Sequence, residues 1–383
     1  MSPFTFQTVA SLVVEPGAAA RLAPVIARLR CHTLFIVTDR GIVDHGLLDP
    51  VLAGLDAAGV ATRVHSGVQA DPPAHVVQAA VQAARDAGAD GVLGIGGGSS
   101  LDVAKLVALL AGGGEALDAV YGVDAACGPR LPLVLVPTTA GTGSEVTPIA
   151  IVTTGDGQKK GVVSRWLLPD VAVLDADLCL SLPPAVTAAT GIDAMVHAIE
   201  AFTSRRLKNP LSDCLALEAL RLLGGHLHTV VAHGDRRDAR AAMLLGAMLA
   251  GQAFANAPVG GVHALAYPIG ARFHVPHGLS NALVLAAVLE FNLDSAHALY
   301  AQLADVLLPR ATGTAIERAR ALVAWLRALP AEVGLPTRLR DVGIAAADID
   351  ALAGDAMLQT RLLVNNPVDI EFDDARAIYR SVL

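Results

Sequence analysis

The chain has 383 residues, a length that favours two domains over a single core. Apolar residues make up 53% of it and charged residues only 17%, which excludes disorder as a description of the whole chain. The 36 acidic residues outnumber the 28 basic ones, and no Lys/Arg block occurs, so no basic stripe is available for binding nucleic acid. A surface this poor in charge also suggests burial against a second copy of the chain.

One long segment has no charged residue and raises the question of a membrane span. Residues 241–271 contain no Asp, Glu, Lys or Arg, and their number is sufficient to cross a bilayer. The segment also contains Gln252, Asn256 and a Gly260-Gly261 pair, and no Lys/Arg cluster flanks it. We therefore expect a buried helix followed by a loop, and no membrane association.

The cysteines and the N-terminus bear on the compartment. Four cysteines are scattered without a C-x-x-C pair, which is typical of reduced thiols rather than of a disulfide framework. The first residues lack both a basic region and a long apolar run, so they do not resemble a signal peptide. We expect a cytoplasmic protein.

Strand-like and helical patterns alternate in the first half of the chain. Helical spacing covers residues 74–87 and 101–110. Six short runs are strand-like, at residues 33–38, 61–65, 91–95, 131–136, 149–153 and 171–175. This alternation predicts βαβ units and a parallel, Rossmann-like sheet.

The pattern changes after Pro183-Pro184, where helical spacing begins to dominate and continues to the C-terminus. We therefore expect an α/β domain over residues 1–182 and an all-helical domain over residues 183–383.

A glycine-rich turn separates one predicted strand from the following helix. Three glycines, residues 96–98, precede Ser99 and Ser100, and either serine can cap the helix. The free N–H groups and the dipole of a helix N-terminus favour a phosphate. Ser99 stands where the third glycine of G-x-G-x-x-G would be, and no G-K-[ST] follows. A tight turn without a ligand therefore remains an alternative.

A second polar turn, residues 137–145, follows the next strand and carries several hydroxyl groups. Loops at the carboxyl ends of neighbouring parallel strands line the ligand crevice of such sheets, so the two turns together predict a bound pyrophosphate. Asp39 ends an earlier strand. A carboxylate there accepts hydrogen bonds from ribose hydroxyls and repels a 2′-phosphate, which favours NAD(H) over NADP.

The helical half contains a candidate metal site. Asp193 and His197 are four residues apart on one predicted helix, so both side chains lie on one face. His263 and His277 follow downstream, and three imidazoles with one carboxylate suit one divalent metal, Fe(II) or Zn(II). Spacing alone leaves each histidine open to a structural role. We expect Glu200 to be a surface carboxylate, with a hydrogen bond to a ligand as the alternative.

Four segments together resemble a known family. Residues 96–105, 137–147, 191–200 and 261–281 are similar, in order, to motifs of the iron-containing (group III) alcohol dehydrogenases. The resemblance extends from about Phe4 to the C-terminus without a large insertion. It implies an NAD-binding α/β domain, a helical metal-binding domain, a cleft between them, and a homodimer or larger oligomer.

The resemblance also implies roles for individual residues. The implied metal ligands are Asp193, His197, His263 and His277. The implied cofactor-binding residues lie in the first half of the chain: Asp39, Gly97, Gly98, Ser99, Asp102, Thr138, Thr139, Thr142 and Lys160. Of these, Asp39 would contact the adenosine ribose, the glycines and Ser99 the pyrophosphate, and Lys160 the nicotinamide ribose. The last alignment also permits Lys159.

One position departs from the family pattern. Many members carry a histidine four residues after the third ligand, where it is a candidate for the proton relay, and this chain has Tyr267. The ordinary pKa of tyrosine is about 10, against about 6.5 for histidine. The candidate catalytic residues are therefore Tyr267 and His274, which lies three residues before His277.

The expected reaction is reversible alcohol oxidation and aldehyde or ketone reduction. Hydride passes between nicotinamide C4 and a small substrate whose alcohol or carbonyl oxygen is bound and polarised by the metal. The alternatives are a maleylacetate-reductase-like enzyme of the same family and a dehydroquinate-synthase-like metal/NAD lyase. A metal-dependent hydrolase and a non-catalytic dinucleotide sensor are the rivals from other classes. Phe254, Phe273 and Leu363 suggest an apolar substrate pocket.

Overall fold

The computed structural model describes residues 3–155 and 158–383 and divides the chain into two compact units. One unit is Gln7–Ser181, and the other is Leu182–Leu383 with the described residues that precede Gln7. Each unit has its own secondary-structure class, α/β in the first and helical in the second.

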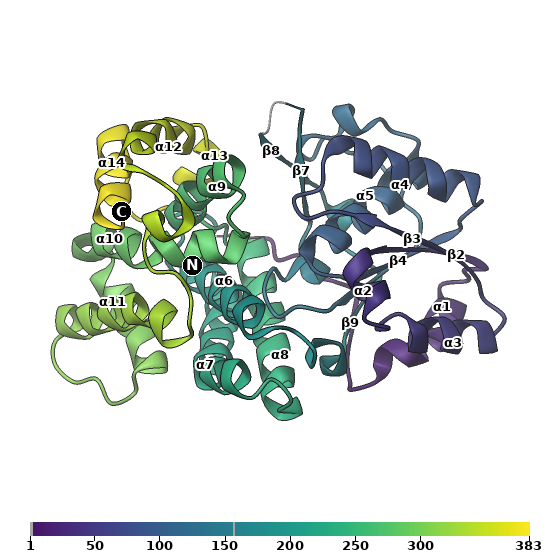
Figure 1. Ribbon diagram of the computed structural model, residues 1–383, viewed down its shortest axis with the longest axis horizontal. Coiled ribbons are helices and arrows are strands. Elements are labelled where there is room, and N and C mark those ends of the chain that lie inside the picture. The colour runs from purple at the N-terminus through teal and green to yellow at the C-terminus, as the bar shows by residue number, and fades with distance from the viewer. Residues whose placement is uncertain (1–2, 156–157) are drawn as a thin grey trace. The chain divides into compact units, whose positions relative to one another are not determined.

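A six-stranded sheet forms the centre of the α/β unit (Figure 1). Its strands, in spatial order, are β1 (Ser11–Val14), β9 (Val171–Leu174), β6 (Leu133–Pro137), β4 (Gly91–Gly96), β2 (Thr33–Asp39) and β3 (Ala61–Val68). All neighbouring pairs are parallel. The predicted parallel sheet is confirmed, and β1 is an edge strand that the sequence patterns did not reveal.

Both faces of this sheet are covered by helices: α1 (Ala23–Arg28), α2 (Arg40–Asp44), α3 (Asp49–Ala57), α4 (Ala74–Asp86) and α5 (Gly98–Gly113). Along β2, Phe35 and Val37 belong to the apolar core that includes α4 and α5. Leu34 and Ile36 belong to the opposite core, which includes α1 and α3. Continuous apolar sequence in β2 follows from this burial on two faces.

The strand order reverses beside β2. The chain runs from β2 outward to β3, and then returns through α4 to β4 on the other side of β2. In open α/β sheets such a switch point places the ligand crevice at the carboxyl ends of the two strands. Here those ends carry Asp39 and Gly96.

A second, three-stranded sheet has the order β5 (Gly122–Val123), β8 (Lys159–Val163) and β7 (Ile149–Thr153). The predicted strand at residues 149–153 exists, but it pairs antiparallel with β8 and does not join the main sheet. Neither β5 nor β8 was expected, because β5 is only two residues long and β8 begins with two lysines and a glycine.

Every regular element of the second unit is helical within residues 182–383. In chain order the helices are α6 (Pro184–Thr203), α7 (Pro210–Ala232), α8 (Arg237–Asn256), α9 (Gly261–Phe273), α10 (His277–Leu307), α11 (Ala315–Glu332), α12 (Ile349–Met357), α13 (Thr360–Leu363) and α14 (Phe372–Ser381). Helix α6 packs against α7, α8 and α10, so it lies in the core of the unit.

The uncharged segment at residues 241–271 forms most of α8 and α9, which bend by 107° at the break between them. Among the described helices, α10 is long and apolar enough to cross a membrane. Helices α8 and α9 together are also long and apolar enough, if the bent pair is counted as one span. Of the most apolar window in α10, 56% is buried inside the protein, as in the core helix of a helical bundle.

A charged cluster is buried beneath the α/β unit's polar loops. The Lys105 ammonium, on α5, donates to the Thr147 hydroxyl (3.1 Å) and the Ile149 carbonyl (2.7 Å), and it lies 3.5 Å from Asp102. Glu145 is also buried beside this lysine, and burial raises its pKa to about 7. The cluster ties α5 to the 137–149 segment.

The raised pKa of Glu145 predicts a pH-dependent stability. Its ordinary value is 4.5, so between about pH 4.5 and 7 the unfolded chain ionises this group while the folded chain keeps the proton. Wild-type stability attributable to Glu145 is therefore complete below pH 4.5 and falls until about pH 7. We predict that Glu145→Gln becomes progressively more stable, relative to wild type, over this range.

Denaturant titration of the two proteins at pH 4.5 to 8 measures this difference. Gln78→Ala, an uncharged change on the exposed face of α4, is the matched control and should give a difference that does not vary with pH. A flat difference for Glu145→Gln as well would contradict the assignment.

Candidate functional site

Four side chains from three helices of the helical unit converge on one point. Asp193 and His197 come from α6, His263 from the first turn of α9, and His277 from the first residue of α10. Each offers one ligand atom, and these atoms all lie within 4.8 Å of one another. Asp193, His197 and His263 are buried, whereas His277 is partly exposed.

The geometry fits a single divalent ion. Asp193 Oδ1 lies 3.5 Å from His277 Nε2 and 4.0 Å from His263 Nε2. Two donors at about 2.0–2.2 Å from one ion are at most about 4.4 Å apart, so shifts of a few tenths of an ångström complete a coordination sphere. His197 Nδ1 is buried and has no hydrogen-bond partner within the described chain.

Charge also fits a cation at this point. Burial lowers the pKa of His197 to about 4, so the imidazole is neutral near pH 7 and has a lone pair to offer. Burial by itself would raise the pKa of Asp193, but the neighbouring histidines and the Asn281 amide hold it below its ordinary value. One carboxylate with neutral imidazoles is a donor set for Fe(II) or Zn(II).

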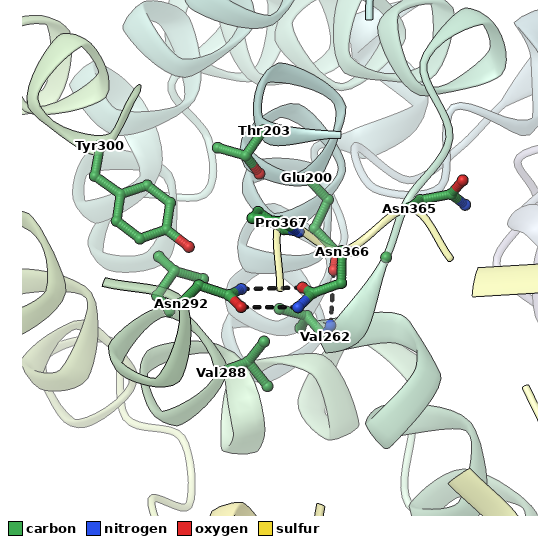
Figure 2. A pocket seen from close by; sticks show the side chains of 11 residues that line it. Glu200, Thr203, Val262, Val288, Asn292, Tyr300, Asn365, Asn366 and Pro367 are labelled. Atoms are coloured by element: carbon green, nitrogen blue, oxygen red, sulfur yellow. Dashed lines mark hydrogen bonds between the residues drawn. The ribbon is translucent and has the colours of Figure 1, made fainter. Parts of the chain in front are cut away.

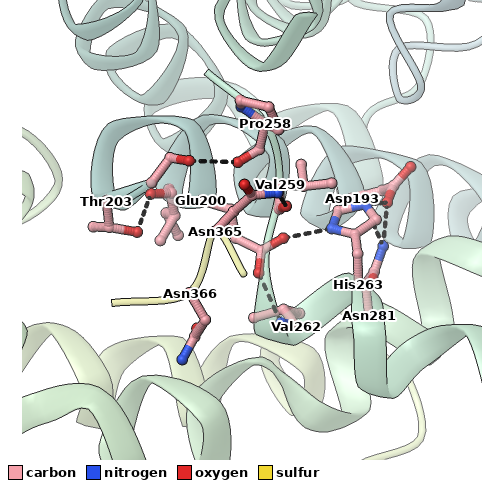
Figure 3. Close-up of polar contacts among 12 residues, drawn as sticks. Asp193, Glu200, Thr203, Pro258, Val259, Val262, His263, Asn281, Asn365 and Asn366 are labelled. Atoms are coloured by element: carbon pink, nitrogen blue, oxygen red, sulfur yellow. Dashed lines mark hydrogen bonds and ion pairs between the residues drawn. The ribbon is translucent and has the colours of Figure 1, made fainter. Parts of the chain in front are cut away.

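Glu200 was expected at the surface, and that expectation is wrong. Its side chain is buried and lines a cavity of the helical unit (Figure 2). One carboxylate oxygen accepts from His263 Nδ1 at 2.6 Å and the other from the Val262 amide at 2.7 Å (Figure 3). The bond to Nδ1 leaves the Nε2 lone pair of His263 directed at the metal position. Glu200 therefore forms a hydrogen bond to one of the four clustered side chains, which was the alternative to a surface position.

Asn281 is a residue of this site that sequence reasoning did not assign. Its amide nitrogen donates to Asp193 Oδ1 at 2.6 Å and lies 3.2 Å from His263 Nε2 and 3.4 Å from His277 Nε2. It lies in α10, one turn after His277, so the i, i+4 spacing was a signal that could have identified it.

The candidate catalytic residues lie in different surroundings. The Tyr267 ring contacts His263 edge-on and is tilted against His277, with centroids 6.3 and 5.8 Å apart. His274 is exposed and ends α9 in a left-handed conformation, at φ 55°. Phe254, from the predicted apolar lining, stacks on His197 at 4.4 Å between centroids.

The glycine turn of the α/β unit opens α5 without a side-chain cap. Gly97 is the N-cap residue, and neither Ser99 nor Ser100 fills the capping role expected of one of them. The Ser100 hydroxyl instead donates to Asp39 Oδ2 at 3.1 Å. The N–H groups of the first helical turn thus have no side-chain cap, which is the arrangement that binds phosphate.

The two polar turns lie side by side. A Cβ atom on Gly98 would come within 2.7 Å of the Thr142 side chain, and one on Gly97 would face Thr139 at 3.7 Å. The Thr138 amide donates to the Gly96 carbonyl at 3.0 Å, which joins the ends of β6 and β4. The structure therefore brings together the glycines and threonines that the resemblance assigned to the cofactor.

Three other predicted cofactor residues have definite partners. Asp39 caps α2 by accepting from the Ile42 amide, while Asp102 accepts from the Ser144 hydroxyl at 2.6 Å and the Ile151 amide at 2.9 Å. Lys160 is exposed, with its ammonium 6.0 Å from the Tyr121 ring centre. Its neighbour Lys159 instead pairs with Asp71 at 2.7 Å. Gly157, which opens this lysine motif, lies outside the described residues.

A doubly covered parallel sheet with an uncapped glycine turn, and a helical unit with a carboxylate–histidine centre, define a metal-dependent, dinucleotide-linked class of oxidoreductase. Comparison with known proteins narrows the class. Residues 10–176 match the family described as "Iron-containing alcohol dehydrogenase", and residues 187–383 match "Fe-containing alcohol dehydrogenase family, C-terminal". The chain belongs to the iron-containing alcohol dehydrogenase family.

Individual family members are similar to this chain over nearly its whole length. The chain is 40% identical to a long-chain-alcohol dehydrogenase 1 of Geobacillus thermodenitrificans, over 98% of this chain and 97% of the relative. A crystal structure of 1,3-propanediol oxidoreductase superposes with a TM-score of 0.96 at 32% identity, covering 100% of both chains. The structure of a sulfoacetaldehyde reductase of Bifidobacterium kashiwanohense, solved in complex with NAD+, superposes with a TM-score of 0.90 at 28% identity. The match covers 100% of this chain and 99% of that chain.

The Glu200–His263 bond predicts a measurable effect on metal affinity. Glu200→Ala removes the acceptor that orients His263, and loss of such a partner typically costs about 10–100-fold in metal affinity. Glu200→Gln keeps an acceptor oxygen and should recover much of that loss. Competition for Zn(II) against a chromophoric chelator measures both.

Glu218→Gln is the matched control, because Glu218 pairs with Arg221 on the exposed side of α7. Its Zn(II) affinity should equal that of wild type. Equal affinities for wild type and Glu200→Ala would show that Glu200 does not orient the ligand.

Proposed function

We propose that this family member is a metal-dependent, NAD(H)-linked alcohol dehydrogenase that also reduces small aldehydes or ketones. The observation that carries the proposal is the convergence of one carboxylate and three imidazoles, all but His277 buried, on a single point. Asp193, His197, His263 and His277 would hold one divalent ion, Fe(II) or Zn(II). Such an ion supplies Lewis-acid chemistry, which stabilises the alkoxide form of an alcohol and polarises a carbonyl.

The residues of the chain would then supply orientation and exclusion of water. Glu200 and Asn281 hold two of the ligands in position by hydrogen bonds. Phe254 and Tyr267 surround the centre with aromatic surface, which limits water near a reacting carbon. The centre therefore suits a small substrate with one alcohol or carbonyl oxygen and an adjoining apolar part.

The α/β unit would bind the dinucleotide. The uncapped first turn of α5, at Gly97, Gly98 and Ser99, would bind the pyrophosphate, with Thr138, Thr139 and Thr142 beside it. Asp39 at the end of β2 would accept from the adenosine ribose hydroxyls and favour NAD(H) over NADP. Lys160, whose side chain is exposed, would reach the nicotinamide ribose, and Asp102, which accepts from the Ser144 hydroxyl, would lie near the middle of the cofactor.

The proton route would involve Tyr267 and His274. The Tyr267 ring lies beside His263 and His277, at the position where the resemblance implies a relay histidine in many family members, so its hydroxyl is the candidate for that role. His274 is solvent-exposed at the end of the same helix, so its imidazole is accessible to water.

Two alternatives are less well supported: a maleylacetate-reductase-like enzyme, which acts on a dicarboxylate, and a dehydroquinate-synthase-like lyase, which binds a phosphate group. They require several free cationic side chains near the metal. Arg272 pairs with Asp355, Arg205 with Asp369, and Lys208 with Asp213. These three cations already have carboxylate partners, so a neutral alcohol, aldehyde or ketone suits the helical unit better than a maleylacetate-like or phosphorylated substrate.

We further propose a cytoplasmic homodimer or larger oligomer. Edge strand β1 carries two exposed apolar side chains, Leu12 and Val14, and such an edge is ordinarily protected by a partner. The four cysteines are free thiols, in agreement with a reducing compartment.

The test is NADH oxidation with a panel of small aldehydes and ketones, before and after Fe(II) or Zn(II) is added to metal-free protein. We expect activity only with metal. We also expect His263→Ala to lose at least about a hundredfold in activity, because this variant has only three of the four donors left for the ion. NADH binding by His263→Ala, followed by fluorescence, should persist, because the residue lies outside the α/β unit. Metal-independent activity, or full activity in His263→Ala, would contradict the proposal.

A further inference from the structure

A pair of asparagines lies behind the metal ligands, at a place that the proposed chemistry does not use. Asn292, in the middle of α10, and Asn366, in the segment after α13, are each only 2% exposed. The Asn292 amide donates to Asn366 Oδ1 at 2.9 Å, and the Asn366 amide donates back to Asn292 Oδ1 at 2.7 Å (Figure 2). The Asn366 amide also donates to the Val368 carbonyl at 2.6 Å.

Asn366 packs directly against the turn that begins α9. A Cβ atom on Gly261 would come within 2.7 Å of Asn366 Oδ1, and one on Gly260 within 3.1 Å of the Asn366 backbone nitrogen. The two glycines therefore admit a contact that no larger residue allows without displacement. The neighbouring Asn365 extends the contact, because its amide donates to the Val259 carbonyl at 2.9 Å (Figure 3).

This turn leads directly into the metal centre. Val262 and His263 follow Gly261, and both are tied to Glu200, the first through its backbone amide and the second through Nδ1. A shift of the Gly260–Gly261 turn would therefore move the His263 ring and its hydrogen bond together. His263 is fixed from two sides, by Glu200 on α6 and by Asn366 against the turn.

Reciprocal hydrogen bonds hold the two side chains in one arrangement. Asn292 and Asn366 line a small cavity, large enough for about one water molecule, together with Glu200, Thr203 and Tyr300. Buried amides cost free energy unless they are satisfied, and each of these two satisfies the other. A fully satisfied polar pair of this kind specifies one arrangement of the segments it joins.

We propose that Asn292 and Asn366 are positioning residues for the metal centre. Through the Gly260–Gly261 turn they hold His263 so that its Nε2 lies close to the ligand atoms of Asp193 and His277. The segment after α13 therefore determines how slowly a bound ion is released. The inference rests on the proposed metal-dependent function, because it presumes that the four ligands bind an ion.

The experiment compares Zn(II) release from wild type, Asn366→Ala, Asn292→Ala and the double variant. Each protein is loaded with one Zn(II) and mixed with excess chromophoric chelator well below its unfolding temperature. We expect each single variant to release the ion about tenfold faster or more, as for loss of other supports of a metal ligand. The double variant should match the single ones, because each change removes the same pair.

A second readout separates positioning from a general loss of stability. Co(II) replaces Zn(II), and its visible absorption reports the arrangement of the donors. The spectrum should change in Asn366→Ala and Asn292→Ala while thermal unfolding stays cooperative. Asn366→Asp, which keeps the shape and one of the two reciprocal bonds, supplies the test if the alanine variants do not fold, and it should also release Zn(II) faster than wild type.

Arg361→Ala is the matched control, because this exposed side chain lies on α13, directly before that segment, and should leave Zn(II) release unchanged. Release rates and Co(II) spectra equal to wild type in the asparagine variants would overturn the proposal, even if those variants were less stable. Failure of the wild-type protein to bind Zn(II) would instead refute the metal-dependent function on which the proposal rests.

Discussion

The hydrogen bond from His263 to Glu200 is the interaction on which the helical unit's chemistry depends. A buried carboxylate and two buried imidazoles are costly in an apolar core unless charge and hydrogen bonding compensate them. Glu200 fixes the tautomer and direction of the His263 imidazole, and Asn281 orients the Asp193 carboxylate by donating to Oδ1. A cation at their common point would complete this compensation, so the same contacts that stabilise the fold prepare the site.

In the α/β unit, buried charges hold the predicted dinucleotide-binding turns in place. Its ligand crevice lies where the strand order reverses, between the ends of β2 and β4. A buried cluster of Asp102, Lys105 and Glu145 joins the helix that begins at the glycine turn to the following polar segment. Burying these charges is expensive, and the cluster fixes the relative positions of the two turns that would contact a pyrophosphate.

Much of this could be predicted from the sequence because the signals were local. Runs of β-branched residues identified β2, β3, β4 and β6, and the i, i+4 spacing on α6 placed two ligands on one face. The hairpin formed by β7 and β8 was missed because lysines and glycine at its second strand carry little β propensity. Edge strand β1 was missed because four residues give almost no periodic signal.

Glu200 illustrates a signal that was present and misjudged. Helix α6 is apolar around its whole circumference, so its only acidic residues, Asp193 and Glu200, had no exposed face to occupy. The roles of Asn292 and Asn366 could not have been predicted, because they lie 74 positions apart and meet only through tertiary packing. Local sequence therefore identified the four side chains that converge, while the residues that support them required the folded structure.

The central claim is that one carboxylate and three imidazoles hold a single ion. Zinc-edge X-ray absorption of protein reconstituted with one Zn(II) tests it most directly. The account predicts nitrogen and oxygen scatterers at about 2.0–2.1 Å, multiple scattering from three imidazole rings and no sulfur. A sulfur shell at about 2.3 Å, or fewer than three imidazoles, would contradict it.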